Sequence, residues 1–390
     1  MNTAKTVIVL GGGVGGAVTA GTLRRKLPQP HRVVLIDRQA DHVFAPSFLW
    51  LMTGGRTARQ ISRPLRRLER KGIEVVIGEI EEIDVEARRV WVTEPGSAGG
   101  PAIEADYVVV SLGAGLAPET IPGLPEAGHN FYTLDGAETL RDALATFGGG
   151  RVVVLTAAPA YKCPAAPYEA AMLIDHHLRK RGLGDGSTID LYAAEPGPLG
   201  VAGPEVSAGV RQIVEEKGIA YHPEHQVVAV DPVRRRITFA GGATADFDLL
   251  AYVPPHRAPE VVTRAGLVDE SGWIPVDRAS LETRHPGVYA IGDVTNIPLK
   301  LGKPLPKAGV FAEREALVVA HNIAAEISGG DTTRFDGHGE CFIETGGGKA
   351  GFGRGDFYAE PTPEVRLHPV SRRWHVGKIL FEKTWLRRWF

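Results

Sequence analysis

A glycine-rich turn between an apolar run and a helical run constrains the fold of this chain more than any other feature. Residues 6–10 are mostly β-branched, as expected of a buried parallel strand, and residues 17–26 have the pattern of a helix. Gly11, Gly13 and Gly16 lie between them with the spacing G-x-G-x-x-G. Gly11 permits the tight turn, Gly13 lets a pyrophosphate approach the backbone, and Gly16 lets the helix pack close to the strand. Because a helix N-terminus attracts phosphate, this turn predicts a dinucleotide site.

An acidic residue follows the next predicted strand, in the order that a dinucleotide-binding unit requires. Residues 32–36 form a second apolar run, and Asp37 comes directly after it, where its carboxylate can accept hydrogen bonds from a ribose. Gly12, inside the turn, joins the predicted cofactor site. A glycine-rich turn without a ligand would explain neither this order nor the acid.

Two later segments favour FAD over NAD at this site. Residues 106–114 form a strand that ends in small residues, among them Gly113, and residues 287–293 form a strand that ends in Gly292 and Asp293. With the N-terminal turn, these segments resemble the two-dinucleotide-binding flavoprotein superfamily. The resemblance implies a glutathione-reductase-like fold and a flavin whose ribityl chain is held by Asp293, with Gly292 beside it.

A second glycine-rich turn is missing at the position where members of that superfamily bind NAD(P)H. Residues 151–155 predict the required strand, but residues 156–163 after it contain no glycine. Side chains at residues 157–159 would crowd a pyrophosphate, and Pro159 has no backbone N–H to donate. We therefore predict that NAD(P)H does not bind there. The alternative is a degenerate loop without a role, but this loop has acquired Cys163.

The two cysteines, Cys163 and Cys341, are too few for a secreted disulfide scaffold. Pro164 favours the start of a helix, which would place Cys163 at or near the helix N-cap. The helix dipole and the neighbouring Lys162 are then expected to stabilise a thiolate and lower the pKa of Cys163. From composition alone, both cysteines could instead be inert members of the core.

The surroundings of these cysteines are similar to a more specific family. Residues 162–169, Lys-Cys-Pro-Ala-Ala-Pro-Tyr-Glu, resemble the signature of sulfide:quinone oxidoreductases and the related flavocytochrome c sulfide dehydrogenases. The resemblance continues through residues 306–313, the pair Cys341-Phe342 and the tail at residues 378–383, so it covers essentially the whole chain.

This resemblance implies a redox role for Cys163 and Cys341. In the family, two cysteines flank the flavin ring, cycle between bridged and reduced forms, and pass two electrons to FAD. Glu169 matches a glutamate that acts as an acid or base near the cysteines; the alternative is a carboxylate on the helix surface. The resemblance also assigns Lys307 and Gly309 to the cofactor site, and Phe342 and Lys383 to a quinone site, although Lys383 could equally be a plain surface lysine.

The predicted reaction follows from the same resemblance: hydrogen sulfide is oxidised to sulfur or polysulfide, and a membrane quinone accepts the electrons. The alternatives are a quinone-reducing flavoprotein with another donor and a redox-sensing flavoprotein. Tyr132 and Gly136 stand where many members have a third cysteine and a histidine, and Pro198 replaces another histidine, so sulfide entry and sulfur release are expected to differ. No cysteine lies near residues 44–47, which excludes a covalent FAD link there, so FAD is expected to bind non-covalently.

The C-terminal residues 378–390 combine bulky apolar and basic side chains. On a helical wheel one half carries the apolar residues Ile379, Phe381, Trp385, Leu386, Trp389 and Phe390, and the other carries Lys383, Arg387 and Arg388. Such a helix suits a membrane surface; the alternative is a helix docked on the protein's own core or on a partner subunit. We found no secretion signal and no apolar run of about 18 residues, so a peripheral protein on the cytoplasmic side of the membrane is expected.

The whole chain is predicted to be an α/β protein with two Rossmann-like domains and a C-terminal layer of strands and a helix. Its 390 residues, 43% hydrophobic and 23% charged, suffice for two or three domains. The predicted boundaries are 1–115 with 251–330 for the FAD-binding domain, 116–250 for the second Rossmann-like domain, and 331–390 for the C-terminal region. The net charge of −2 gives no sign of a nucleic-acid partner, no metal site is predicted, and a homo-oligomer stays open.

Overall fold

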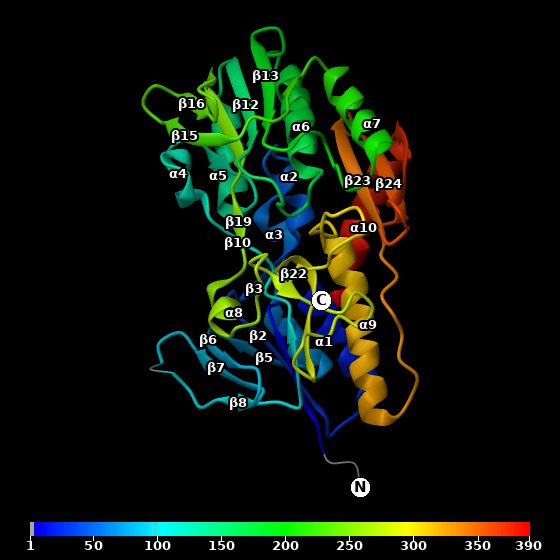
Figure 1. Cartoon of the computed structure of the whole chain (residues 1–390). Helices are drawn as coiled ribbons and strands as arrows, with labels where there is room; N and C mark the ends of the chain where they lie inside the picture. Colours follow the sequence, from blue (N-terminus) through cyan, green and yellow to red (C-terminus); the bar gives the residue numbers. More distant parts are fainter. Residues whose placement is uncertain (1–3, 98) are drawn as a thin grey trace.

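The computed structural model describes residues 4–97 and 99–390 and has two α/β lobes, one above the other in Figure 1. The lower lobe is built on a five-stranded parallel sheet in the order β21-β9-β1-β2-β5. Its strands are β1 (Thr6–Leu10), β2 (Arg32–Asp37), β5 (Glu74–Ile77), β9 (Tyr107–Val110) and β21 (Val288–Ala290). The last strand returns to the sheet after the chain has passed through the upper lobe (Figure 1).

Alternate side chains of the lower sheet face two different layers. Val7 and Val9 belong to the core shared with the helices α1 (Val14–Lys26) and α9 (Gly309–Ser328). Ile8 and Leu10 pack toward a three-stranded meander of β6 (Glu79–Asp84), β7 (Arg89–Thr93) and β8 (Ile103–Glu104). Because both faces of the sheet are covered, its strands are apolar without alternation, as the sequence predicted.

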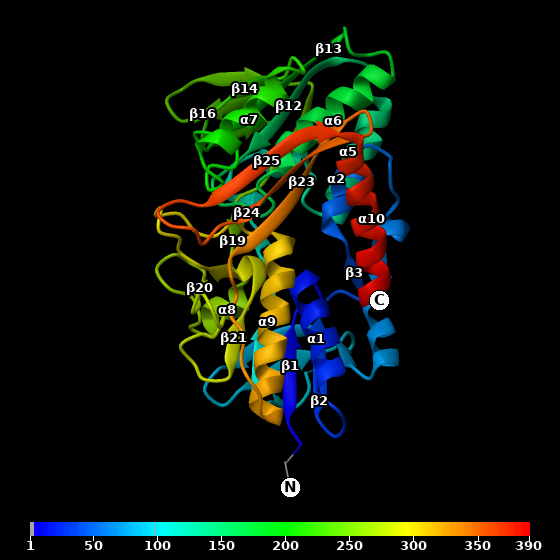
Figure 2. The same ribbon diagram turned by 90° about the vertical axis from the view of Figure 1, so that its right-hand side faces the viewer.

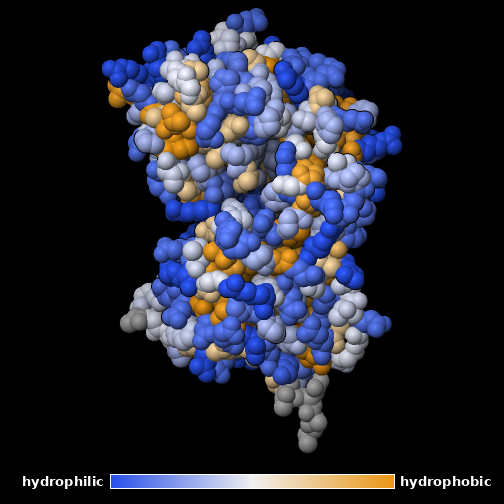
Figure 3. Space-filling view, in the orientation of Figure 1, coloured by the Kyte–Doolittle hydropathy of each residue, from blue (hydrophilic) through white to orange (hydrophobic). Residues whose placement is uncertain are grey.

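Shorter elements lie in the connections of the lower sheet, and the one at residues 48–51 reaches the upper lobe (Figure 1). After β2 the chain forms β3 (Asp41–Val43), α2 (Phe48–Leu51), α3 (Ala58–Ile61) and β4 (Ser62–Pro64), and after the upper lobe it forms α8 (Glu260–Arg264), β20 (Ile274–Pro275) and β22 (Thr295–Asn296). The two lobes are joined by β10 (Gly115–Leu116) and β19 (His256–Arg257), which pair antiparallel. Figure 3 shows a waist between the lobes on a mostly polar surface.

The upper lobe repeats the plan of the lower one around a second five-stranded parallel sheet, β11-β18-β12-β13-β14. Val152 and Val154 of the central strand share a core with the flanking helices, and Val153 and Leu155 face a meander of strands. The sheet consists of β11 (His129–Asn130), β12 (Gly150–Thr156), β13 (Ser187–Ala193), β14 (Ala220–His222) and β18 (Leu249–Val253). The helices are α4 (Leu124–Ala127), α5 (Leu134–Thr146), α6 (Ala166–Lys180) and α7 (Pro204–Glu215), and the meander is β15 (Val227–Asp231), β16 (Arg236–Phe239) and β17 (Thr244–Asp246).

The C-terminal residues form an antiparallel sheet and a helix that touch both lobes. Strands β23 (His338–Gly346), β24 (Lys349–Asp356) and β25 (Glu364–Ser371) cross the molecule diagonally in Figure 2 and lead into α10 (Arg372–Trp389). Strand β23 packs against α6 of the upper lobe and α9 of the lower lobe. This packing carries the second cysteine, on β23, to the loop that holds the first.

The predicted fold class is confirmed: the chain has two Rossmann-like units and a C-terminal layer of strands and a helix. The division at residues 115, 250 and 330 stays a prediction, which the strand membership of the two sheets supports. Helix α1 begins at Val14, earlier than predicted, because Ala17 N–H already bonds to the Gly13 carbonyl oxygen at 3.0 Å. Among the described residues, no helix has the length and apolar character needed to cross a bilayer.

Candidate active site

The glycine-rich turn leaves space for a ligand at Gly13. A Cβ atom at Gly16 would lie 1.7 Å from the Gly11 carbonyl oxygen, and one at Gly11 would lie 2.3 Å from the Ser111 carbonyl oxygen. At Gly13, by contrast, a Cβ atom would meet no described atom within 4 Å. Helix α1 begins at the next residue, Val14, so its first N–H groups point toward this space. The arrangement suits a pyrophosphate at the helix N-terminus.

Asp37 and His42 hold this turn through hydrogen bonds with Gly12. His42 was not among the residues predicted from the sequence. The Asp37 Oδ2 atom accepts a hydrogen bond from the backbone N–H of Gly12. The His42 Nδ1 atom lies 2.9 Å from the Gly12 carbonyl oxygen, and its ring stacks on Trp385 and Phe390. Burial lowers the pKa of His42 to about 4, so a neutral imidazole donates from Nδ1 at pH 7. The ribose contact of Asp37 stays a prediction.

Asp293 lies in a short turn that is held in place by hydrogen bonds with Lys307 and Glu315. Its Oδ1 atom is buried and has no hydrogen-bond partner among the described residues. Lys307 Nζ donates to the Asp293 and Thr295 carbonyl oxygens, both at 2.8 Å, and Gly292 N–H donates to the Glu315 carboxylate at 2.6 Å. Burial raises the pKa of Asp293. A buried carboxylate oxygen without a partner is costly, and a ribityl hydroxyl of FAD would satisfy it.

The other predicted cofactor residues, Lys307, Gly309 and Gly113, lie near the Asp293 turn and the glycine-rich turn. The Lys307 ammonium group is buried over the Trp273 ring, 3.6 Å from its centre, so it supports the Asp293 turn from inside the protein. Burial lowers the pKa of Lys307 to about 8. Gly309 is the first residue of α9 and lies against Val14 of α1, while Gly113 follows β9 with a φ of +66°. Two helix N-termini therefore meet beside the glycine-rich turn.

The two cysteines come from distant segments and lie close together. Cys163 is in the loop between β12 and α6, and Cys341 is on β23. Both are free, half-buried thiols, near enough for the charge of Cys163 to raise the pKa of Cys341. Cys163 has the left-handed φ of +50°; its N–H donates to the Lys307 carbonyl oxygen at 2.7 Å, and the Tyr132 hydroxyl donates to the Cys163 carbonyl oxygen at 3.1 Å. The fold thus assembles a cysteine pair.

The predicted lowering of the Cys163 pKa was wrong. Helix α6 begins at Ala166 and its N-cap is Ala165, so Cys163 lies near the helix N-terminus but two residues before the cap. Burial and the Glu169 carboxylate raise the pKa of Cys163 to about 12, although the Lys378 ammonium and the Ala166 N–H act in the opposite direction. Burial also raises the pKa of Cys341. Desolvation therefore outweighs the helix dipole, and both cysteines are neutral thiols at pH 7 when reduced.

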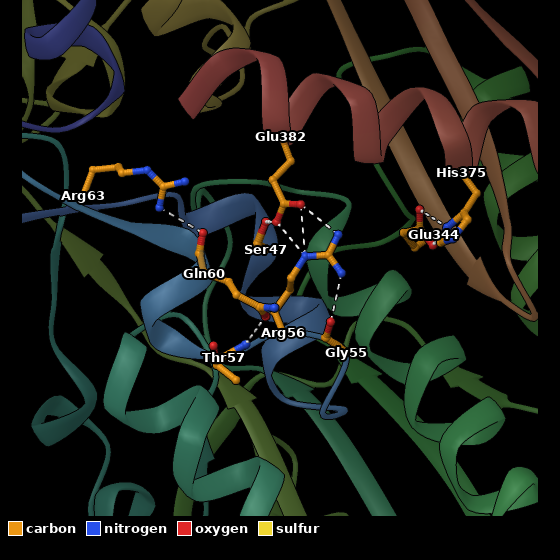
Figure 4. Close-up of polar contacts among 9 residues, drawn as sticks. All are labelled: Ser47, Gly55, Arg56, Thr57, Gln60, Arg63, Glu344, His375 and Glu382. Atoms are coloured by element: carbon orange, nitrogen blue, oxygen red, sulfur yellow. Dashed lines mark hydrogen bonds and ion pairs between the residues drawn. The ribbon is translucent and has the colours of Figure 1, made fainter. Parts of the chain in front are cut away.

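Glu169 is a buried carboxylate and not a residue of the helix surface. It is 2% exposed, and its Oε1 atom accepts from Lys378 Nζ at 2.8 Å and from the backbone N–H of Glu344 at 2.7 Å. The Glu344 carboxylate in turn lies 2.9 Å from His375 Nδ1 (Figure 4). Burial raises the pKa of Glu169. Burial alone would lower the pKa of Lys378, but the two glutamates outweigh it and the pKa is raised. The cysteine pair thus lies beside a buried network that can hold a proton.

Helix α10 docks on the segment at residues 47–56 through charged contacts (Figure 4). The Glu382 carboxylate accepts hydrogen bonds from the Arg56 guanidinium, at 2.8 Å from Nη2, and from Ser47 Oγ at 2.6 Å. Its side chain is only 5% exposed, so Arg56 compensates a buried charge. Trp385 and Trp389 are buried further along the helix. Ser47 lies in the segment where the sequence excluded a flavin-linking cysteine.

The apolar half of the predicted tail helix packs largely on the protein itself, and its basic half is exposed. Trp385, Leu386 and Trp389 are buried in the protein's own core, as in the docking alternative. The exposed large apolar residues of α10 are instead Val376, Leu380 and Phe381, which are 51%, 58% and 39% exposed. A helical wheel separates apolar from basic residues, but it does not show which apolar residues pack inward.

The two residues assigned to a quinone have different surroundings, and their contact with a quinone stays a prediction. The Phe342 ring packs on Phe352, with ring centres 5.0 Å apart, and lies 6.3 Å from Phe381 of α10. Lys383 is exposed on the outer side of the helix. The lysine that faces inward is Lys378, which is 6% exposed.

Comparison with known proteins agrees with this geometry. The pyridine nucleotide-disulphide oxidoreductase family matches residues 5–316. The chain is 30% identical to the sulfide-quinone reductase of Aquifex aeolicus over 98% of its own length and 90% of that protein. It is 24% identical to the mitochondrial sulfide:quinone oxidoreductase of Mus musculus, over 91% and 79% of the two chains. The X-ray structure of the Aquifex aeolicus enzyme matches with a TM-score of 0.89 at 28% identity, covering 99% of this chain and 91% of that one.

The fold and the site therefore define an FAD-dependent oxidoreductase of the pyridine nucleotide-disulphide class. Within that class, the chain belongs to the sulfide:quinone oxidoreductase family. This confirms the resemblance that the cysteine segment and the tail indicated.

Sequence reasoning missed several residues that shape the site. His42 carried no signal, because its role depends on stacking with residues more than 300 positions later. Lys378 did carry one: it shares a helical face with Glu382, Trp385 and Trp389 at spacings of four, three and four residues. Charged residues within an aromatic stripe indicate buried, paired charges. Glu315 lies nearly two turns into α9, where the sequence alone could not show its bond to Gly292.

Proposed function

We propose that this protein oxidises sulfide to sulfur or polysulfide at Cys163 and Cys341 and reduces a membrane quinone. In the oxidised enzyme the two cysteines form a bridge. Hydrosulfide attacks this bridge, so that one cysteine keeps the added sulfur as a persulfide and the other leaves as a thiolate that carries the electron pair. FAD, bound non-covalently, would accept this electron pair and pass it to the quinone. As the pair leaves, the persulfide loses its proton and its outer sulfur bonds to the other cysteine, which restores the bridge with one sulfur added.

One observation carries this proposal. A cysteine pair lies where a second dinucleotide-binding unit would have its glycine-rich turn. Cys163 ends the loop after β12, and β23 brings Cys341 beside it. The Lys378 ammonium favours the thiolate form of both cysteines and so stabilises the leaving group. Glu169 supports proton transfer at the pair, because it is buried next to both cysteines and hydrogen-bonded to Lys378.

The choice between sulfide and a nicotinamide is tested by steady-state reduction of a soluble quinone analogue. We expect sulfide to support turnover, and we expect kcat/KM for NADH and NADPH to be at least about a hundredfold lower, or about 2.7 kcal/mol in transition-state free energy. The reason is the loop at 156–163, which offers side chains and a proline where a pyrophosphate would bind. Rapid quinone reduction by NADH would contradict the proposal.

Two alternatives give different outcomes in the same assay. A quinone-reducing flavoprotein with another donor would fail with sulfide, yet its chemically reduced flavin would be reoxidised by quinone. A redox-sensing flavoprotein would be reduced slowly and would show no quinone turnover. Sulfide-driven turnover in the wild type excludes both.

We further propose that the outer side of α10 lies on the membrane surface. Its apolar centre is Val376, Leu380 and Phe381, and basic residues stand before and after it: Arg372, Arg373, Lys383, Arg387 and Arg388. Apolar side chains can enter the headgroup region while basic ones attract anionic lipids. Phe381 also lies next to Phe342, so this proposal gives a lipid quinone a path toward the site.

Leu380→Glu is expected to weaken binding to anionic vesicles by at least about tenfold, because it removes about 2 kcal/mol of apolar burial and adds a negative charge. Vesicle co-flotation measures this binding. Val233→Glu is the matched control, since Val233 is a 90% exposed apolar residue in the turn between β15 and β16 of the upper lobe. Equal vesicle binding by the two variants would contradict the membrane proposal.

A further inference from the structure

Glu195 occupies the position in the upper lobe at which a dinucleotide-binding unit carries its ribose-binding acid. In the lower lobe the acid predicted for this role is Asp37, the last residue of the strand that pairs with β1. In the upper lobe the corresponding strand is β13, where Ala193 pairs with Thr156 and Glu195 follows two residues later. Both acids therefore lie at the carboxyl edge of a parallel sheet, beside the loop that follows its first strand.

The carboxylate of Glu195 is already engaged by hydroxyl groups of the protein. Its Oε1 atom accepts from the Tyr161 hydroxyl at 2.5 Å and from the Tyr168 hydroxyl at 2.9 Å, and its Oε2 atom accepts from Thr156 Oγ1 at 2.8 Å. Tyr161 and Tyr168 are both buried. These donors come from the end of β12, from α6, and from the loop between them at residues 157–165, called the cysteine loop. One carboxylate therefore connects the three segments around Cys163. Hydrogen bonds to a carboxylate are stronger than those between neutral groups.

The cysteine loop needs such a connection because its backbone is strained. Ala160 and Cys163 have φ values of +64° and +50°, in the left-handed region that residues with a Cβ atom disfavour. Tyr161 lies directly after the first of them, and its side chain reaches Glu195. A strained segment persists only where surrounding contacts hold it. Besides the Tyr161 contact, hydrogen bonds hold the loop at Cys163, through Tyr132 and the Lys307 carbonyl, and at its start, where Ala157 bonds to Val253 and Gln226. The strained residue Ala160 lies between these two points.

We propose that Glu195 and Tyr161 are positioning residues for the cysteine pair. Their hydrogen bond holds the loop in the strained conformation that places Cys163 beside Cys341. This inference rests on the proposed redox role of the pair, but it does not depend on sulfide as the donor. The upper lobe has the strand order and the acid of a dinucleotide-binding unit, and this acid, Glu195, binds the cysteine loop. A ribose would have to displace the hydroxyls of Tyr161 and Thr156 to reach it.

The equilibrium between the thiol form and the bridged form of the holoenzyme in a glutathione buffer reports how well the two cysteines are placed to react with each other. In this reaction the two protein thiols form the bridge while one oxidised glutathione is reduced to two thiols. Tyr161→Phe is expected to lower the equilibrium constant at least about tenfold, because the thiols are less well placed to react with each other. It is also expected to raise the rate at which iodoacetamide alkylates Cys163. Glu195→Leu should shift both measurements the same way, since its apolar side chain of similar size offers the Tyr161 hydroxyl no acceptor.

Tyr252→Phe is the matched control, because Tyr252 is another buried tyrosine of the upper lobe, on β18. It should leave both measurements at the wild-type values. FAD content and the thermal midpoint are recorded for every variant, and if Glu195→Leu loses its fold, Tyr161→Phe decides. Wild-type equilibrium constants and alkylation rates in the folded variants would overturn the inference. A wild-type protein that forms the bridge but does not react with sulfide would contradict the proposed donor and leave the positioning role supported.

Discussion

Gly13→Ala is expected to weaken FAD binding at least about tenfold, or about 1.4 kcal/mol, while the stability of the apoprotein changes by no more than about 1 kcal/mol. A Cβ atom at this position meets no described atom within 4 Å, and the backbone angles, φ −69° and ψ −163°, are open to alanine. The added methyl group would occupy the space in which a pyrophosphate approaches the start of α1. Titration of the apoprotein with FAD measures the affinity, and urea unfolding measures the stability.

Gly16→Ala is the matched comparison within the same turn. Its Cβ atom would lie 1.7 Å from the Gly11 carbonyl oxygen, so the helix and the strand would have to move apart. We expect a loss of about 3 kcal/mol or more in unfolding free energy, together with loss of FAD. Wild-type FAD affinity in Gly13→Ala would contradict the placement of the pyrophosphate. A Gly13→Ala apoprotein as unstable as Gly16→Ala would contradict the open space at this residue.

The lower lobe could be predicted from sequence because its determinants are local. The apolar run at 6–10, the glycine spacing and Asp37 lie within one βα unit, and each restricts the backbone or the packing directly. The same holds for the strand at β12 and for the missing glycines after it. These features correctly indicated that a strand, a helix and a strand follow one another along the chain in each lobe.

The chemistry around Cys163 could not be predicted in the same way. A proline and a lysine beside the cysteine indicated a helix N-cap and a lowered pKa, but the decisive effect is burial against residues far along the chain. Glu169 and Lys378 stand 209 positions apart, and only the packing of α10 on the cysteine site brings them to 2.8 Å. Local sequence does not report desolvation, because desolvation depends on everything that packs around a group.

For the C-terminal helix, the sequence pattern identifies the apolar side chains but not the surface that each of them contacts. Its apolar residues were recognised correctly, but Trp385 and Trp389 face the core while Leu380 faces outward. The division depends on the register between α10 and its neighbours, which Glu382 fixes through Arg56 and Ser47. A membrane surface and a protein core both bury apolar side chains, so a hydrophobic pattern alone does not distinguish them.

Cys163→Ser and Cys341→Ser are each expected to slow flavin reduction by sulfide about a thousandfold or more. Serine cannot form the bridge that hydrosulfide attacks, and a single remaining cysteine cannot both hold a persulfide and release a thiolate partner. The change from sulfur to oxygen is small, and both residues are only half-buried, so FAD content should be kept. Reoxidation of the dithionite-reduced flavin by quinone should also be kept, which separates electron entry from electron exit.

Anaerobic rapid mixing with stoichiometric hydrosulfide, followed through the flavin absorbance, tests electron entry through the cysteine pair most directly. We expect one hydrosulfide per FAD to bleach the wild-type flavin in a single turnover and to leave both serine variants oxidised on the same timescale. Bleaching at the wild-type rate in either Cys163→Ser or Cys341→Ser would contradict electron entry through the pair.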